Sequence, residues 1–202
     1  MLTQHNMTDD SALIQAYISG DNDSMSKLMD RYKKKIYKYI LLTVKNDSVA
    51  DDIFQDLFIK IQKSLKSDRY IDNGKFLSWT LRIAHNLIID YFRQKKQSNL
   101  VSTDDEGQSN IMYSQSLVES NIEDKLVDDQ IKTDLRRLVD SLPIEQREVV
   151  ILRHYLGMSF KDIATHTDVS INTALGRMRY ALINLRKMIE DNNMYMDLKN
   201  YS

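Results

Sequence analysis

Residues 159–186 decide the fold of the C-terminal part of the chain and read SFKDIATHTDVSINTALGRMRYALINLR. Ser159 is followed three residues later by Asp162, a capping-box pattern that predicts the start of a short helix. After a turn at 168–169, Ser170 is placed to cap a longer helix. Two helices joined by a short turn, with the second able to enter a major groove, form a helix-turn-helix. We therefore predict a helix-turn-helix in this stretch.

The longer helix of this pair has two distinct faces. Its apolar positions recur at spacings of four, three and four, which predicts a core of Ala174, Met178, Ala181 and Leu185. The opposite side carries Asn172, Leu175, Gly176, Arg179, Ile183 and Arg186. Similar helix pairs occur in proteins that do not bind DNA, so the pattern alone leaves that alternative open. Two further helices are expected upstream, the second running from Pro143 to about Leu156 and ending at Gly157.

The composition of the whole chain also favours helices. The 202 residues include one Pro and five Gly, too few for the frequent turns of a β-sandwich or barrel. The absence of Cys excludes disulfides, thiolate metal sites and Cys nucleophiles, and fits a reducing compartment. The longest apolar runs have four residues, far short of the roughly 20 that span a membrane, and residues 1–10 do not resemble a signal peptide. We expect an all-α cytoplasmic protein without membrane insertion of its own.

Charge is distributed unevenly along the chain, although the net charge is −1. Residues 99–130 hold eight of the 29 acids and one of the 28 bases, which leaves 27 bases and 21 acids elsewhere, a net charge of +6. The acids are Asp104, Asp105, Glu106, Glu119, Glu123, Asp124, Asp128 and Asp129. Self-repulsion and polar composition favour an extended, partly disordered linker. The predicted organisation is a helical domain at 10–97, a linker at 98–130 and a helix-turn-helix domain at 131–191, followed by a frayed tail.

The first domain is predicted to contain four helices, of which the third has an acidic side. The third helix is expected to begin at Ser48, with Asp51 completing a capping box. Its predicted core stripe consists of Ala50, Ile53, Phe54, Leu57, Phe58, Ile61 and Leu65. Asp51, Asp52, Gln55 and Asp56 lie on the other side. Acids in a first turn also suit the helix dipole, which explains Asp51 and Asp52 without a binding role but explains Asp56 less well.

The fourth helix combines aromatic and basic side chains. Residues 76–96 read FLSWTLRIAHNLIIDYFRQKK. Aromatic rings can stack on unpaired bases while basic groups hold phosphates, as in proteins that bind single-stranded nucleic acid. The alternative is an ordinary amphipathic helix with a core stripe of Phe76, Trp79, Ile83, Leu87 and Tyr91, and composition alone favours that alternative.

Three blocks together resemble the small extracytoplasmic-function (ECF) type of bacterial RNA polymerase sigma factor. The first is ADDIFQDLF at 50–58, and the second lies at 76–93. The third begins at Leu142-Pro143 and continues through Arg147, Leu152-Arg153, Gly157, Ser159, Asp162-Ile163-Ala164, Ser170, Thr173 and Arg177. Their order and spacing agree with the family over roughly residues 10–190. No block decides alone, but three in order are specific.

The resemblance implies a role for each block. The acidic helix would bind the largest subunit of core RNA polymerase through Asp52, Gln55 and Asp56. The aromatic–basic helix would capture the melted −10 element through Trp79, Arg82, Asn86, Arg93, Lys95 and Lys96, with Asn86 beside a flipped base. The helix-turn-helix would sit on the second-largest subunit and read the −35 element through Ser159, Asn172, Thr173, Gly176, Arg177 and Arg179. The resemblance also implies an anti-sigma protein as a partner, and no cofactor, metal or catalytic residue.

The DNA-reading helix departs from the family pattern. After Thr173 the family usually has Val, a basic residue and Ser, whereas this chain has Ala174, Leu175 and Gly176. Leu175 and Leu182 cannot hold phosphate as Lys or Arg would, so the −35 consensus does not follow from the sequence. We expect Asn172 and Arg179 to contact base edges, and Arg177 to contact phosphate or stabilise the domain.

Two other function classes compete with this interpretation. A stand-alone helix-turn-helix regulator would leave the first domain without a role. A metal-dependent nuclease would use Asp51, Asp52, Asp56 or Asp90, but the first three share one helix and lack a ligand from a second element. The histidines are scattered, at His5, His85, His154 and His166. We therefore expect no enzymatic activity of the chain's own.

Overall fold

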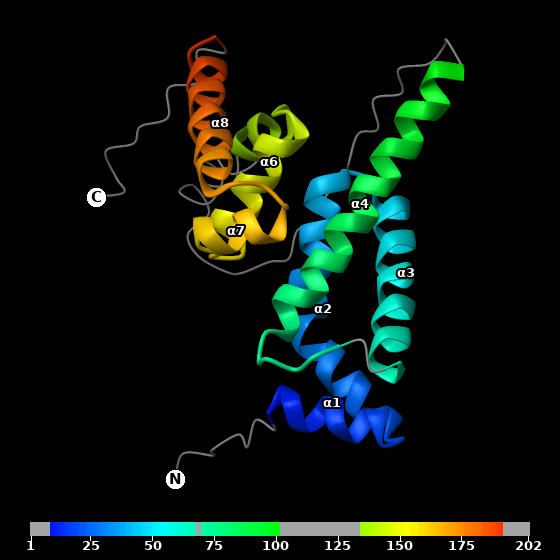
Figure 1. Cartoon of the computed structure of the whole chain (residues 1–202). Helices are drawn as coiled ribbons and strands as arrows, with labels where there is room; N and C mark the ends of the chain where they lie inside the picture. The colour runs from blue at the N-terminus through cyan, green and yellow to red at the C-terminus, as the bar shows by residue number, and fades with distance from the viewer. Residues whose placement is uncertain (1–8, 68–69, 102–133, 192–202) are drawn as a thin grey trace, which may run out of the picture. The chain divides into compact units, whose positions relative to one another are not determined.

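The computed structural model describes residues 9–67, 70–101 and 134–191 (Figure 1). These residues form helices joined by turns and contain no strand, which confirms the predicted all-α class. The chain divides into two units, 1–107 and 108–202. Residues 102–133, with all eight acids of the predicted linker, lie outside the described residues, as does the predicted tail after Asp191.

The described residues of the N-terminal unit form four helices, as predicted. These are α1 (Asp10–Ile18), α2 (Asn22–Val44), α3 (Asp47–Lys66) and α4 (Phe76–Val101). Helix α2 packs against α1, α3 and α4, and α3 also contacts α4 (Figure 1). Leu28, Ile36, Leu57, Ile61 and Ile88 are completely buried, which places the core between α2, α3 and α4. Helix α4 reaches Val101, so the first four residues of the predicted linker are helical.

The start of α3 differs from the prediction. Asn46, rather than Ser48, is the N-cap, and its side-chain oxygen accepts a hydrogen bond from the Val49 N–H at 3.0 Å. Asn is as good an N-cap as Ser, so the helix begins two residues earlier. Asp51 does not complete a capping box but accepts a hydrogen bond from the Tyr37 hydroxyl at 2.8 Å.

The buried face of α4 also differs from the predicted stripe. Of the five predicted core residues only Phe76 is buried, while Trp79, Ile83, Leu87 and Tyr91 are half-buried. The buried positions after Phe76 are Thr80, Leu81, Ala84, His85 and Ile88. Helix α4 packs against both α2 and α3, so the face between these neighbours is covered rather than the most apolar stripe. The predicted core stripe was therefore wrong beyond Phe76.

The C-terminal unit contains the predicted helix-turn-helix. Residues 134–140 are helical, followed by α6 (Ile144–Val150), a π-helical turn η1 (Ile151–Tyr155), α7 (Phe160–His166) and α8 (Ile171–Asp191). Helix α8 packs against α6 and α7 (Figure 1). Gly157, predicted to end the helix, has a φ of 69°, a conformation that Gly adopts without strain.

Both predicted caps of the helix-turn-helix are present. The Ser159 hydroxyl accepts a hydrogen bond from the Asp162 N–H at 3.1 Å and donates to the Asp162 carboxylate at 2.6 Å. Ser170 accepts a hydrogen bond from the Thr173 N–H at 3.0 Å. In the turn between the helices, Asp168 has a φ of 54°, in the left-handed region that Asp tolerates better than most residues. The two helices therefore begin where the sequence predicted.

Candidate nucleic-acid interface

The exposed face of α3 carries the three residues predicted to bind polymerase. Asp52, Gln55 and Asp56 are all exposed, and spacings of three and four place them on one face of the helix. Five of the seven residues of the predicted apolar stripe are buried on the other side, whereas Phe54 and Phe58 are half-buried. The buried residues are Ala50, Ile53, Leu57, Ile61 and Leu65. The acids of this face are thus held at the surface by a fixed helix.

Asp51 lies on the same turn but has a different environment. The Tyr37 hydroxyl of α2 donates its hydrogen bond to this carboxylate, and the Tyr37 ring meets Phe54 edge-on at 5.8 Å between centroids. Burial first and the hydrogen bond to Asp51 second raise the pKa of Tyr37 to about 12. Asp51 therefore joins α2 to α3 and is less available to a partner than Asp52 and Asp56.

Ile59 is a surface residue that the sequence analysis missed. It is 45% exposed and follows Asp52 by seven residues, Gln55 by four and Asp56 by three, so it extends the same face. The sequence does contain a signal for it, because Ile59 is an apolar residue that lies outside the predicted core stripe of α3. This face thus combines carboxylates with one apolar side chain.

Four of the six residues predicted for the −10 element share one face of α4. Trp79, Arg82, Asn86 and Arg93 are separated by three, four and seven residues, which are helical spacings. Arg82, Asn86 and Arg93 are exposed and Trp79 is half-buried. Arg93 is paired with Asp90 at 3.2 Å, an exposed pair of the kind that contributes little stability and is easily exchanged. Lys95 and Lys96 are exposed near the end of the helix.

Tyr70 joins this surface from the loop before α4, which the sequence did not predict. Its ring lies 4.5 Å from the Trp79 ring and 6.2 Å from the Phe76 ring. The Tyr70 hydroxyl donates a hydrogen bond to Asp72 at 3.2 Å. Burial and the nearby Asp72 carboxylate raise the pKa of Tyr70, so the hydroxyl stays protonated at neutral pH. The loop thereby adds an aromatic ring beside Trp79.

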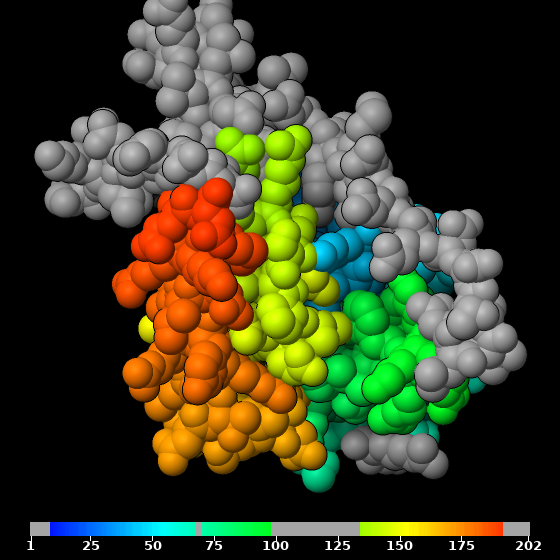
Figure 2. All heavy atoms as spheres, turned by 90° about the horizontal axis from the view of Figure 1, so that it is seen from above, coloured from blue at the N-terminus to red at the C-terminus, as the bar shows by residue number. Residues whose placement is uncertain are grey.

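The face of α8 predicted to read duplex DNA is open. In Figure 2 the side chains of α8 lie beside those of α6, and Ala174, Met178 and Ala181 are buried as predicted, while Leu185 is half-buried. Asn172, Thr173 and Arg179 are exposed, and Gly176 and Arg177 are partly exposed. The Thr173 and Ser170 hydroxyl oxygens lie 2.8 Å apart. The predicted base-contacting residues, Asn172 and Arg179, thus lie at the surface.

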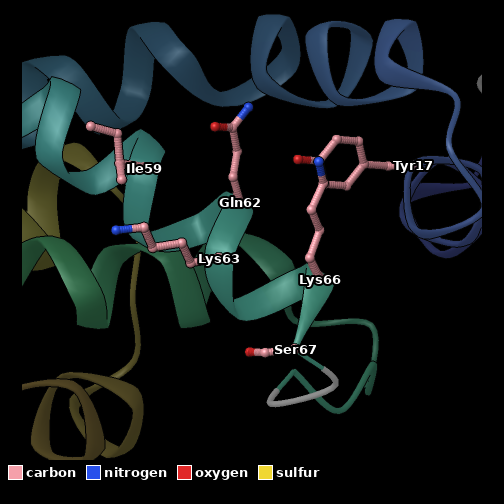
Figure 3. A pocket seen from close by; sticks show the side chains of 6 residues that line it. All are labelled: Tyr17, Ile59, Gln62, Lys63, Lys66 and Ser67. Atoms are coloured by element: carbon pink, nitrogen blue, oxygen red, sulfur yellow. The ribbon is translucent and has the colours of Figure 1, made fainter.

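A groove between α1 and the end of α3 is lined by Tyr17, Ile59, Gln62, Lys63, Lys66 and Ser67, with the Lys66 ammonium 5.3 Å from the centre of the Tyr17 ring (Figure 3). None of these six residues is among the predicted site residues.

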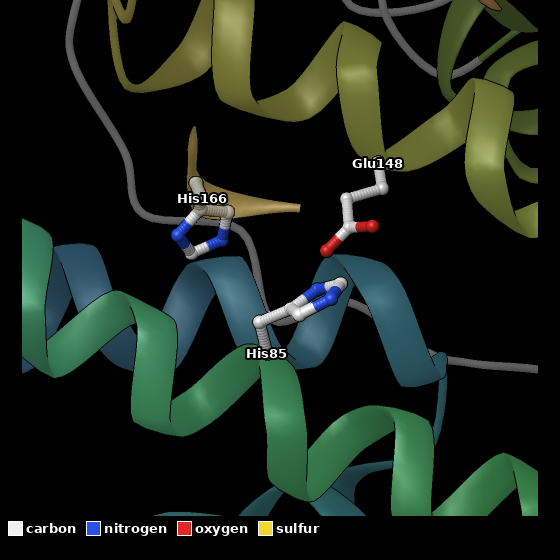
Figure 4. A group of neighbouring side chains, drawn as sticks. All are labelled: His85, Glu148 and His166. Carbon is white, nitrogen blue, oxygen red and sulfur yellow. The ribbon is translucent and has the colours of Figure 1, made fainter. Parts of the chain in front are cut away.

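Figure 4 shows His85 on α4 of the N-terminal unit, and Glu148 on α6 and His166 at the end of α7 of the C-terminal unit. His154 is exposed on η1, and His5 lies outside the described residues. Within the described ranges, Asp51, Asp52, Asp56 and Asp90 belong to no group of three potential metal ligands.

Comparisons with known proteins agree with this arrangement. Residues 28–98 match the family model of Sigma-70 region 2, and residues 132–180 match that of Sigma-70 region 4. The chain is 30% identical over 174 residues to the ECF RNA polymerase sigma factor SigW of Bacillus subtilis, covering 85% of this chain and 92% of SigW. The chain belongs to the ECF RNA polymerase sigma factors.

Two solved structures show the same fold. The sigma factor RpoE of Bartonella quintana, in complex with the anti-sigma factor NepR, has a TM-score of 0.66 at 17% identity, covering 82% of this chain and 96% of RpoE. CnrH, in complex with the cytosolic domain of CnrY, has a TM-score of 0.62 at 19% identity, covering 91% and 99% of the two chains.

As a sigma factor, this protein directs promoter-specific initiation of transcription by RNA polymerase. Sigma factors in general are not enzymes. Of the helices described for this sigma factor, none combines the length and apolar character that crossing a bilayer requires.

Proposed function

We propose that this sigma factor meets its partners through three surfaces. The exposed face of α3 with Asp52, Gln55 and Asp56 binds the largest subunit of core RNA polymerase. The face of α4 captures the melted −10 element through Trp79, Arg82, Asn86, Arg93, Lys95 and Lys96. The α7–α8 helix-turn-helix reads the −35 duplex through Ser159, Asn172, Thr173, Gly176, Arg177 and Arg179, and its unit binds the second-largest subunit.

The observation that carries this proposal is the position of Trp79 and its neighbours on α4. The alternative explanation, a core stripe through Trp79, Ile83, Leu87 and Tyr91, is weakened because these four side chains are only half-buried and other residues of α4 form its buried face. The half-buried Trp79 can stack on a base, and the exposed Asn86 can form hydrogen bonds with a base edge. The exposed basic groups can contact phosphates. These are the groups that a single strand with a flipped base requires.

Two further parts of the proposal rest on the relatives. The structures of RpoE and CnrH contain NepR and the cytosolic domain of CnrY, which supports an anti-sigma protein as a partner of this chain. We also place its action in the cytoplasm, where core polymerase and promoters are found, and assign it no catalytic activity of its own.

The polymerase surface is tested by reversing charge on α3. The double variant Asp52→Lys with Asp56→Lys should no longer co-purify with core polymerase, because two ammonium groups replace two carboxylates and reverse the charge that this face presents to its partner. Circular dichroism should still show a folded helical protein, since both residues are exposed. The matched control is Glu190→Lys with Asp191→Lys, which makes the same charge change on exposed residues of the last turn of α8. Undiminished core binding by the α3 variant would remove the assignment.

A further inference from the structure

Leu175 is an exposed apolar residue in the middle of the face that α8 presents for DNA. Its side chain is 44% exposed, and it follows Asn172 by three residues and precedes Arg179 by four, so the three share one face. The core of the unit does not use it, because Ala174, Met178 and Ala181 already form the buried stripe. An exposed Leu between two polar base-contact candidates therefore needs another explanation.

The chemistry of the major groove offers one apolar feature at a base edge. All four bases present hydrogen-bond donors or acceptors there, and thymine also carries a C5-methyl group. The first residues of a recognition helix approach base edges most closely, and Leu175 is the fifth residue of α8. A Leu at this position cannot hold phosphate, but its methyl groups can contact a thymine methyl.

The neighbouring residue leaves space for this contact. A Cβ added at Gly176 would meet no atom within 4 Å, so packing inside the unit does not require Gly there. Gly176 therefore adds no side chain of its own between the helix backbone and the groove beside Leu175. The pair Leu175–Gly176 therefore provides a small apolar surface where the helix backbone can approach the groove closely.

We propose that Leu175 is a specificity-determining residue that reads the C5-methyl group of a thymine in the −35 element. This inference rests on the proposed role of α8 in reading duplex DNA. Ile171 and Leu182 are also exposed, at 46% and 43%, and a protein could cover such residues. DNA is favoured for Leu175 because Asn172 and Arg179 flank it, whereas Leu182 lies seven residues, about 10 Å, further along the helix.

The experiment uses the full chain assembled with core polymerase. Promoter templates randomised across the −35 region are transcribed, and base preferences are compared between the wild-type protein and Leu175→Ala. At one −35 position, we expect the preference for thymine to fall about fourfold in the variant. This factor corresponds to about 0.8 kcal/mol, the value for burying one apolar carbon group. Deoxyuridine lacks only the methyl group of thymidine. Placed at that position, it should lower transcription by the wild-type holoenzyme about fourfold and leave transcription by the Leu175→Ala holoenzyme unchanged.

Two control variants make the result decisive. Leu182→Ala removes an equally exposed Leu and should keep the thymine preference. Arg179→Ala should alter preference at a different base pair. If Arg179→Ala changes specificity but deoxyuridine and Leu175→Ala do not, the inference about Leu175 is wrong and the role of α8 stands. If none of the variants changes any −35 preference, the role of α8 is wrong as well. If Leu175→Ala weakens core binding without altering thymine preference, Leu175 is a protein contact and the inference is overturned.

Discussion

Arg147 shows how a single buried side chain organises the C-terminal unit. It is 6% exposed, and its guanidinium donates hydrogen bonds to the backbone carbonyls of Asp140 at 3.1 Å and Leu142 at 3.5 Å. Burial lowers its pKa, while the nearby carboxylates of Asp140, Glu148 and Glu145 act in the opposite direction. The guanidinium thus ties the end of the 134–140 helix to α6.

We predict that Arg147→Met destabilises the C-terminal unit. Removing the guanidinium leaves two carbonyls without this donor, a loss of about 1–3 kcal/mol in the free energy of unfolding. Urea denaturation followed by circular dichroism measures it. Arg186→Met, which changes an exposed Arg of α8, should shift the free energy by less than about 0.5 kcal/mol. Equal effects of the two substitutions would contradict a structural role for Arg147.

Asn86 carries a prediction about single-stranded DNA. It is exposed on α4, four residues after Arg82 and seven after Trp79. Asn86→Ala should slow open-complex formation on duplex promoters and weaken discrimination at one −10 base, because the amide no longer binds the edge of a flipped base. On a template with a pre-melted bubble the rate defect should shrink, while base preference stays weakened. Unchanged preference at every −10 base would rule out a contact between Asn86 and a flipped base.

At the scale of the element, α8 differs from its family in charge rather than in fold. Its caps and its residues Ala174, Met178 and Ala181 are as the sequence predicted, but Leu175 stands where the family pattern described in the sequence analysis has a basic residue. We predict that Leu175→Lys binds duplex promoter DNA more tightly at low salt, with the slope of log K against log [salt] steeper by about 0.9, the value for one added phosphate contact.

The same substitution should reduce base discrimination, because the added affinity does not depend on sequence. Leu175→Gln is the matched control: it also loses the apolar side chain, and it adds no charge. Its salt slope should equal that of the wild-type protein. An unchanged slope for Leu175→Lys would show that residue 175 does not approach the DNA backbone.

At the scale of the whole molecule, residues 99–130 are strongly acidic and the rest of the chain has a net positive charge. The eight acids between Asp104 and Asp129 bring the net charge of the chain to −1, and we expect them to compete with phosphates for the basic residues of both units. Free in solution, the chain should therefore bind promoter DNA weakly. We expect core polymerase to relieve this competition by holding both units at promoter spacing, which would turn two weak contacts into one avid contact.

Replacing the eight acids with Asn and Gln at constant length tests this. We predict stronger, salt-sensitive DNA binding by the free variant, measured by titration of a labelled duplex at several salt concentrations, together with poorer assembly with core or poorer initiation. Constant length keeps the tether between the units unchanged, unlike a deletion. Tight, sequence-specific binding by the unaltered free chain would instead support the stand-alone regulator.

The sequence by itself determined the helical class, the helix-turn-helix and most helix ends. These depend on local features: caps such as Ser159 and Ser170, the left-handed Gly157, and apolar periodicity that identified most of the buried residues of α3 and α8. Such features involve only residues close together in the sequence, so they can be recognised without knowing which helices pack against one another. The order of the three motif blocks was sufficient to indicate the family.

Only the tertiary structure decided which face of α4 is buried and what joins it at the surface. Helix α4 has apolar residues on more than one side, so its burial depends on where α2 and α3 pack, and this leaves Trp79 half-exposed. The packing of the loop before α4 brings Tyr70 to Trp79, and the approach of α2 to α3 pairs Tyr37 with Asp51. Contacts of this kind join residues from separate elements, and no local pattern in the sequence encodes them.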